Sequence, residues 1–290
     1  MENCYICNSG NSKIYVKVKN YVITHCNACD HGQLNPIPSN KELEELYKNA
    51  TDDSFCGNGC STSLKEKYKS DRNFLKKYYS DRLGSIEKLN LNKDAAILDF
   101  GCTNGLFVKA IEDNGHTNVY GYDIAEDLVE EGKKEGLKLF SGDLEAFATQ
   151  FEGKFDAIVS YDVFEHLADP RAALKSAHKL LKKDGYLVVR VPYLGSLQGL
   201  VMKEKSPIID PPFHIQYYSR KSMKSFFNTN NFTTLSQSTP FWGKQTDTYL
   251  ELKGVSLPLA KALRIGITPV KFIIEFFNLG GNLLNVTRKN

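Results

Sequence analysis

Between residues 95 and 192 the chain alternates between short apolar runs and longer stretches in which apolar and polar residues recur at helical spacing. The apolar runs predict buried strands, and stretches such as LFVKAIEDNG predict amphipathic helices. Strands that alternate with helices favour a parallel sheet covered by helices on both faces. The predicted strands are 95–100, 118–122, 137–140, 155–161 and 186–191.

One of these helical stretches, DPRAALKSAHKLLKKDG, carries its own start and stop signals. Asp169 suits the N-cap, where a carboxylate accepts hydrogen bonds from free backbone N–H groups. Pro170 suits the first helical position, and Gly185 is expected just beyond the last turn. A single helix is therefore predicted over most of this stretch.

The segments before and after residues 95–192 do not alternate between strand and helix patterns in this way. Before it, Ser39 and Glu42 form a capping-box pattern, and a charged helical stretch covers 63–90. After it comes an insertion rich in Gly and Pro at 193–216, a helix around 220–230, strands at 233–239 and 248–253, and a helix at 268–280. We therefore divide the chain into a small module (1–38), a helical connector (39–92), the sheet domain (93–255) and a C-terminal helical extension (256–290).

The composition is that of a globular protein, with 41% hydrophobic and 24% charged residues in 290. A net charge of +3 is too small to indicate a nucleic-acid partner. The beginning, MENCYICNSG, has neither the basic nor the apolar region of a signal peptide, so we expect a cytoplasmic protein. No apolar run approaches the roughly 18 residues of a membrane span.

Four of the seven cysteines have the spacing of a metal site, C-x2-C followed by a second C-x2-C. Four thiolates suit tetrahedral Zn²⁺ and leave no open position, so the predicted zinc is structural. The alternative is a set of free thiols. Cys56 and Cys60 form a weaker pair, for which a metal, a disulfide or two loop thiols stay open. The predicted zinc ligands are Cys4, Cys7, Cys26 and Cys29.

The stretch AILDFGCTNGLF, residues 96–107, reads as a strand, a tight turn and the start of a helix. Glycines at 101 and 105 let the backbone approach a ligand, and the helix that follows presents its free N–H groups. The spacing is neither G-x-G-x-x-G nor a P-loop. By itself this turn is a weak signal for a nucleotide-type ligand.

Acidic residues after the next strands strengthen that interpretation. Asp123 ends the second strand, at the distance where an acid can bind the two ribose hydroxyls. Asp143 follows the third strand, where a carboxylate could meet an adenine amino group, and YDVFEHLADP follows the fourth. Because ligands of open α/β sheets bind beyond the carboxyl ends of the strands, these segments predict one shared site.

With these motifs the chain resembles class I S-adenosylmethionine-dependent methyltransferases over about residues 93–255. LDFGCTNG resembles the family's LD-x-G-C-G-x-G turn, with Thr103 where a glycine is usual, and FDAIVSYDVFEHLADP and LLKKDGYLVVRVP resemble its later motifs. The resemblance implies a seven-stranded Rossmann-like sheet with an antiparallel strand near one edge. It also implies a cofactor site at Asp99, Gly101, Cys102, Gly105, Asp123, Ile124, Asp143, Leu144, Tyr161 and Asp162.

The four-cysteine module and the segment PPFHIQYYSRKSMKSFF resemble, more narrowly, bacterial methyltransferases that act on sugars and surface glycans. The implied acceptor is a sugar, a nucleotide sugar or a lipid-linked glycan. A hydroxyl or carbon acceptor must lose a proton, and histidine suits that task near neutral pH. His166, His214 and Tyr161 are the predicted catalytic residues, with a packing role as the alternative for each.

Two other functions stay open at this point. An RNA methyltransferase would need a basic face on the cysteine module, yet residues 1–35 carry three lysines against two acids. A non-catalytic cofactor-binding scaffold is favoured only by Thr103. The tail, 254–290, has a net charge of +4, and its helix, 268–280, would pack on its own domain, on a second copy in a homodimer, or on the inner face of a membrane.

Overall fold

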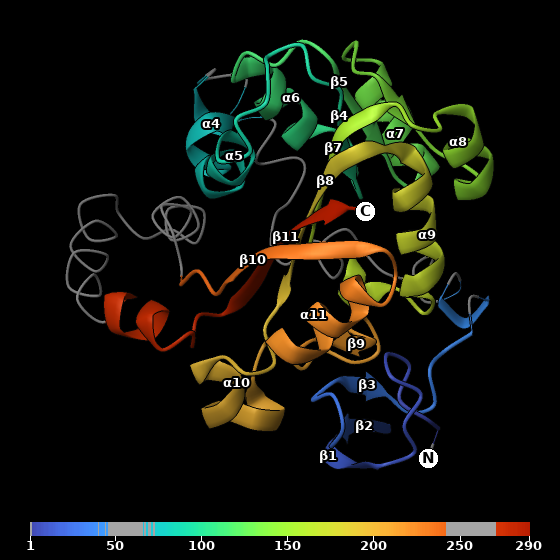
Figure 1. The fold of residues 1–290 in the computed structure, drawn as a ribbon, viewed down its shortest axis with the longest axis vertical. Helices are drawn as coiled ribbons and strands as arrows, with labels where there is room; N and C mark the ends of the chain where they lie inside the picture. Colours follow the sequence, from blue (N-terminus) through green and yellow to red (C-terminus); the bar gives the residue numbers. More distant parts are fainter. Residues whose placement is uncertain are drawn as a thin grey trace.

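The computed structural model describes residues 2–39, 73–241 and 271–290, together with 41–43, 45, 66, 68 and 71. Its centre is a seven-stranded sheet in the order β10-β11-β8-β7-β4-β5-β6 (Figure 1). All neighbours from β8 to β6 are parallel, whereas β11 runs antiparallel to both β8 and β10. The doubly wound, mostly parallel sheet is thus confirmed. Its strands are β4 (Ile97–Phe100), β5 (Val119–Tyr122), β6 (Leu139–Phe140), β7 (Phe155–Tyr161), β8 (Leu181–Pro192), β10 (Phe232–Ser238) and β11 (Asn282–Lys289).

Helices cover both faces of this sheet, as the unbroken apolar strands require. In β7, Val159 faces a core cluster that includes Phe74, and the preceding Ile158 faces a second cluster that includes Leu174. The first cluster is closed by α4 (Phe74–Tyr78), α5 (Ser80–Glu87), α6 (Leu106–Asp113) and α7 (Glu126–Lys133). The second is closed by α8 (Leu144–Gln150), α9 (Pro170–Leu180) and α11 (Arg220–Asn228).

The helix predicted to reach Gly185 is shorter than expected. Asp169 caps α9 by accepting the Ala172 N–H at 3.0 Å, but α9 ends at Leu180. Leu181 is fully buried and pairs with Phe155, so the chain enters the parallel ladder immediately after the helix. Burial of Leu181 in the sheet outweighs the helical pattern, and Gly185 lies inside β8.

In its described residues, 271–290, the C-terminal segment departs from the helical extension that the sequence predicted. Only residues 271–276 are helical among those described in 271–290, and Asn282–Lys289 form β11, between β8 and β10. The strand predicted at 248–253 lies outside the described residues. The last residues of the chain therefore supply the sheet's antiparallel strand, and the division into domains stays a prediction.

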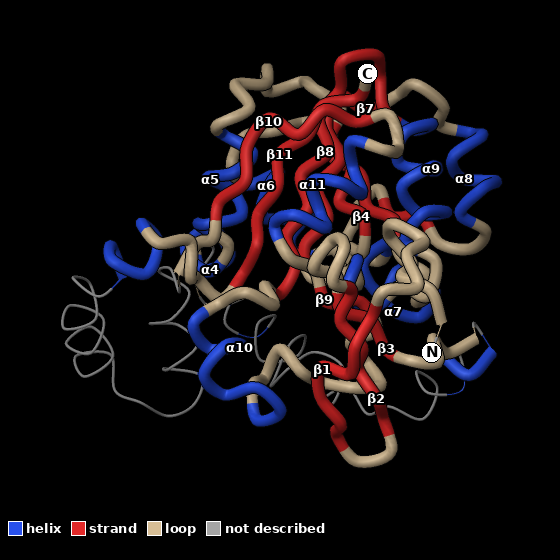
Figure 2. Tube along the Cα trace, turned by 60° about the horizontal axis from the view of Figure 1, so that its bottom comes forward, coloured by secondary structure: helices blue, strands red, loops and turns tan. Residues whose placement is uncertain are grey.

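The N-terminal cysteine module is joined to the main domain by backbone pairing. Its strands β1 (Ser12–Val18), β2 (Tyr21–Cys26) and β3 (Gly32–Leu34) form an antiparallel sheet whose fourth strand is β9 (Gln216–Tyr217), from the far end of the insertion. Figures 1 and 2 show the module beside β9, below the main sheet. A Cβ on Gly32 would lie 3.0 Å from the Cβ of Tyr217, so this close pairing favours glycine.

The remaining connections agree with the sequence where the structure describes them. Ser39 and Glu42 form the predicted capping box: the Ser39 N–H donates to Glu42 Oε2 at 2.7 Å, and the Glu42 N–H donates to Ser39 Oγ at 3.3 Å. Cys56, Cys60 and the loop at 51–62 lie outside the described residues. Among the helices that are described, none has the length and hydropathy needed to cross a bilayer.

The position of β11 leads to a test of its importance. Leu283 is completely buried between β8 and β10, so Leu283→Ala should lower the free energy of unfolding by about 2–5 kcal/mol. Leu235 lies on β10 with 45% of its surface exposed. Leu235→Ala should change the free energy of unfolding by less than about 0.5 kcal/mol. Urea unfolding of both variants measures the difference. Equal, small effects would mean that β11 is not part of the core.

Candidate cofactor and acceptor site

The turn after β4 has three residues in the left-handed region. Gly101, Thr103 and Gly105 have φ values of 91°, 49° and 80°. A Cβ on Gly101 would lie 2.2 Å from Val163 Cγ2, and one on Gly105 would lie 2.6 Å from Leu137 Cδ1, so both glycines are required. Thr103 is β-branched and disfavoured at positive φ, which costs roughly 1 kcal/mol. The turn therefore needs glycine-like geometry at a position that holds a threonine.

Asp123 connects this turn to the next strand end. One carboxyl oxygen accepts the Thr103 N–H at 2.8 Å, and the other accepts the Ala125 N–H at 2.9 Å. Burial raises the pKa of Asp123, although these backbone N–H groups oppose the shift. Ile124 lies next to it with 76% of its surface exposed. An acid and an exposed apolar side chain thus lie together at the carboxyl end of β5.

Asp99 and Cys102 lie deeper in the turn. Asp99 is 4% exposed, and burial raises its pKa to about 7, against the charge of Arg82. Cys102 is buried, and a Cβ on Gly121 would lie 2.7 Å from its Sγ, so the thiol packs between strands. Of Cys102, only the backbone could therefore make the cofactor contact that the sequence predicted.

Asp143 and Leu144 begin α8. Asp143 Oδ1 accepts the Ala146 N–H at 2.6 Å, which makes Asp143 the N-cap of this helix. Leu144 is half-buried against the core. The structure thus gives Asp143 a capping role, and its contact with an adenine stays a prediction.

Tyr161 is not placed to act as an acid or base. Its hydroxyl lies against α5, where it shares a hydrogen bond with Ser85 and donates to the Arg82 carbonyl at 3.2 Å. It is 6% exposed, and burial raises its pKa to about 12. The structure therefore corrects this assignment: Tyr161 is part of the wall of the site.

Two arginines at the site were missed by the sequence analysis. Arg82 of α5 and Arg190 of β8 both form ion pairs with Asp162, which has a φ of 60°. Burial alone would raise the pKa of Asp162, but the charges of Arg190 and Arg82 outweigh it and hold the pKa below its usual value. The Asp162 carboxylate is thus engaged by protein groups.

Arg82 keeps one donor unused. Its guanidinium lies 5.1–5.6 Å from the ring centroids of Tyr79, Phe107 and Tyr161, and its Nε is buried without a hydrogen-bond partner. A buried donor of this kind is costly unless an acceptor arrives. In the sequence, Arg82 lies in a charged helical stretch that looks like a solvated face, and no signal there distinguishes it.

The acceptor end of the site is a cluster of Glu165, His166 and His214, whose potential ligand atoms all lie within 4.8 Å of one another. His166 Nδ1 lies 2.9 Å from the Phe213 carbonyl oxygen, and His214 Nδ1 lies 2.7 Å from that of Ile208. Because a carbonyl can only accept, each Nδ1 carries a proton, and each neutral ring has its lone pair on Nε2. The structure thus brings together the two predicted histidines.

Glu165 supplies the cluster with a carboxyl group from the short helix η1 (Phe164–His166). It is 2% exposed, and neither of its oxygens has a hydrogen-bond partner. Burial, together with the nearby Asp162, raises its pKa to about 8, and burial lowers the pKa of His166. The imidazole of His166 and the Glu165 carboxyl group can therefore exchange a proton, and the donor set of the whole cluster can also hold a divalent cation.

Hydrogen bonds to residues 165–167 and to His31 hold the segment that carries His214. The Ile215 N–H donates to the Glu165 carbonyl at 2.7 Å, and Gln216 Nε2 donates to the Leu167 carbonyl at 3.2 Å. Gln216 Oε1 lies 2.8 Å from Nε2 of the buried His31, beside the cysteines. Only the pairing of β3 with β9 shows what His31 contacts.

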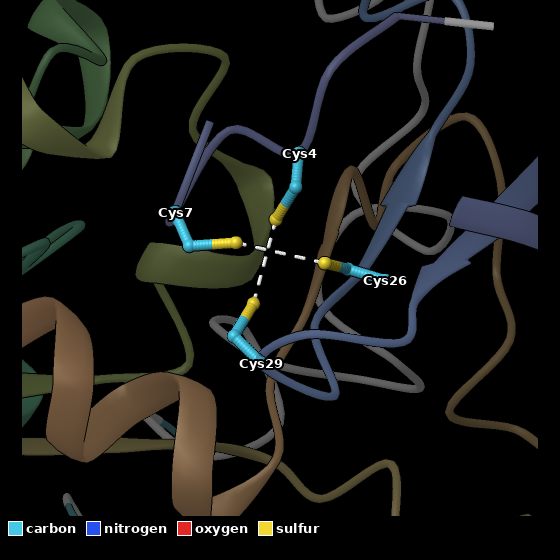
Figure 3. Close-up of side chains that lie close together, drawn as sticks. All are labelled: Cys4, Cys7, Cys26 and Cys29. Atoms are coloured by element: carbon cyan, nitrogen blue, oxygen red, sulfur yellow. Dashed lines mark hydrogen bonds between the residues drawn. The ribbon is translucent and has the colours of Figure 1, made fainter. Parts of the chain in front are cut away.

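The four predicted zinc ligands converge on one point (Figure 3). Their sulfurs all lie within 4.8 Å of one another, with Cys4 and Cys29 separated by 3.5 Å and Cys7 and Cys26 by 3.6 Å. Tetrahedral bonds of about 2.3 Å would place the sulfurs roughly 3.8 Å apart. Donor type and spacing therefore both fit Zn²⁺.

Comparisons with known proteins agree with the fold of the main sheet. The profile of a family described as "Methyltransferase domain" matches residues 70–237, more than half of the chain. Curated relatives include ubiquinone biosynthesis O-methyltransferases from Paracidovorax citrulli, 27% identical over 37% of this chain and 47% of the relative, and from Xanthomonas oryzae, 31% identical over 32% and 41%. The chain thus spans less than half the length of these relatives.

Solved structures support the fold alone. A SAM-dependent methyltransferase from Archaeoglobus fulgidus matches with a TM-score of 0.52 and 18% identity, over 78% of this chain and 97% of that one. A chain from the complex of a methyltransferase with the Trm112 activator of Haloferax volcanii matches with a TM-score of 0.52 and 16% identity, over 77% and 96%.

The strain at Thr103 can be measured by comparing two substitutions. At ordinary positions alanine is more stable than glycine by about 0.4–1 kcal/mol. At a φ of 49° the order should reverse, so Thr103→Gly should unfold at higher urea concentration than Thr103→Ala. Thr117 is exposed and has no positive φ, and it should show the ordinary order. If the alanine variant were more stable than the glycine variant at both sites, Thr103 would not be strained.

Proposed function

The chain belongs to the methyltransferase-domain family, and we propose that it transfers the methyl group of S-adenosylmethionine to a hydroxyl group of a small molecule. The observation that carries this proposal is the cluster that Glu165 and His166, after β7, form with His214, which directly precedes β9. Both histidines have their lone pairs on Nε2, the state in which imidazole accepts a proton.

The residues around the glycine turn fit the proposed cofactor. S-adenosylmethionine, when bound, supplies a methyl group on a positively charged sulfur. The carboxylate of Asp123 lies where it would bind the ribose, and the exposed Ile124 would cover one face of the adenine. The unpartnered Arg82 Nε would pair with the cofactor's own carboxylate. The buried polar atom at Arg82 thus gains the acceptor that it lacks.

The histidine cluster would remove the proton from the acceptor. As the methyl group leaves the cofactor's sulfur and bonds to the acceptor oxygen, Nε2 of His166 would take the hydroxyl proton, and the imidazolium would carry it until solvent removes it. Glu165, 3.9 Å from Nε2, stabilises that imidazolium once it is ionised. The Phe213 carbonyl keeps the ring in the required tautomer.

For the acceptor, we favour a sugar hydroxyl, in a nucleotide sugar or a lipid-linked glycan, because of the cysteine module and the segment around His214. The names of the curated relatives favour a phenolic hydroxyl as the second candidate. Incubation with methyl-labelled cofactor, nucleotide sugars and catechols would separate the two. Label recovered in RNA would exclude both small-molecule acceptors and indicate an RNA methyltransferase. Label recovered in no fraction would indicate a non-catalytic scaffold.

The role of His166 is testable with a matched histidine. His166→Ala should lower kcat roughly 100- to 10,000-fold, the usual contribution of a general base. Its cofactor affinity should stay unchanged, because the ring contacts Phe213 and His214, at the proposed acceptor end of the site. His178→Ala, on α9, should leave kcat unchanged. A His166→Ala enzyme with normal kcat would exclude this mechanism.

We further propose that the four cysteines hold a structural zinc ion. Four thiolates leave no open coordination position, so the metal would take no part in methyl transfer. Its role would be to support the small module, whose strand β3 pairs with β9, next to His214.

Loss of one ligand should therefore have a local consequence. Cys26→Ser should remove the zinc, from one ion per chain to none by atomic absorption, and should speed amide exchange in 214–218, because β9 loses its partner. Cys102→Ser, which changes a buried cysteine outside the module, should keep the zinc. Zinc bound in neither protein would contradict the assignment.

A further inference from the structure

Exposed apolar side chains are concentrated in two short segments. Of the eleven large hydrophobic residues exposed in the described part of the chain, eight lie in 197–202 or 272–277. The first segment is α10 (Leu197–Met202), and the second contains the helical residues 271–276. The eight, which we call the apolar patch, are Leu197, Leu200, Val201, Met202, Phe272, Ile273, Phe276 and Phe277.

The two halves of the apolar patch are physically connected. The Leu197 N–H donates to the Leu279 carbonyl at 2.9 Å, so the first residue of α10 is held by the loop that follows the second helix. The Tyr193 N–H donates to the Gly281 carbonyl at 2.9 Å in the same place. Both segments lie on the left of the molecule in Figures 1 and 2.

The second helix is held in one orientation. Ile274 is only 6% exposed and anchors it, and Glu275 accepts the Phe241 N–H at 2.8 Å. Phe272, Phe276 and Phe277, by contrast, are 63–79% exposed. Three phenylalanines held facing outward are unusual for a surface that only meets water.

Positive charge borders the apolar patch. Lys203 and Lys205 follow α10 directly and are exposed, with Glu204 between them, and Lys271 opens the second helix, 3.7 Å from Glu275. In sequence, residues 254–290 carry five basic residues and one acid. Apolar side chains bordered by lysines match a lipid surface with anionic headgroups.

We propose that the apolar patch docks this protein on an anionic membrane surface, with the two short helices lying in the interface and not across it. Helix α10 and the described helical residues 271–276 are far shorter than a span, and phenylalanine and leucine are typical of the buried face of interfacial helices. Because α10 belongs to the same insertion as His214, docking would bring the acceptor end of the site near the membrane.

The direct test is sedimentation with vesicles, using the full chain. Vesicles of phosphatidylcholine with phosphatidylglycerol should bind the protein, and pure phosphatidylcholine should bind it much less. Phe276→Ser with Phe277→Ser should lower the partition coefficient about tenfold or more, since each phenylalanine contributes through burial in the interface. Lys203→Glu with Lys205→Glu should remove most of the preference for phosphatidylglycerol.

Controls separate docking from folding and from dimer formation. Ile14→Ser and Leu235→Ser change exposed apolar residues outside the apolar patch and should bind vesicles as the wild type does. All variants should keep the wild-type melting temperature. Unchanged binding after Phe276→Ser with Phe277→Ser would overturn the proposal. Dimers that dissociate in that variant, with no vesicle binding by the wild type, would assign the surface to a second copy.

Discussion

The pairing of β3 with β9 is the constraint on which the acceptor end of the site depends. Two residue pairs, Gly32 with Tyr217 and Gln33 with Gln216, join segments almost two hundred residues apart. On its other side the same segment is held to Glu165 and Leu167 by backbone and amide hydrogen bonds. His214 is thus fixed between a cysteine module and the loop after β7, and the two histidines can face one carboxyl group.

Four unfavourable features of the structure lie around the carboxyl ends of β4 and β7. Thr103 and Asp162 both have positive φ, the Glu165 carboxyl group is buried without a hydrogen bond, and Arg82 has an unused donor. Each of these costs free energy in a protein without ligand, which is why we propose that ligands bind at this edge of the sheet. A core buried on both faces of the sheet offsets these costs.

The parallel strands could be predicted because burial on both faces makes them unbroken apolar runs. β11 could not, because its fully buried positions Asn285 and Thr287 are polar and hide the alternation. Their side-chain oxygens pair with distant groups: Gln237 Nε2 donates to Asn285 Oδ1 at 2.7 Å, and Thr287 Oγ1 donates to the Leu187 carbonyl at 3.1 Å. Arg82 was missed, and Tyr161 wrongly assigned, because side-chain direction depends on tertiary packing.

The central claim is that the turn after β4 and Asp123 form a binding site for S-adenosylmethionine. Calorimetric titration of the wild type and of Asp123→Ala with S-adenosylmethionine and S-adenosylhomocysteine tests it most directly. The account predicts micromolar binding by the wild type and its loss in the variant, because the carboxylate held by Thr103 and Ala125 contacts the ribose. No binding to the wild type at millimolar concentration would contradict it.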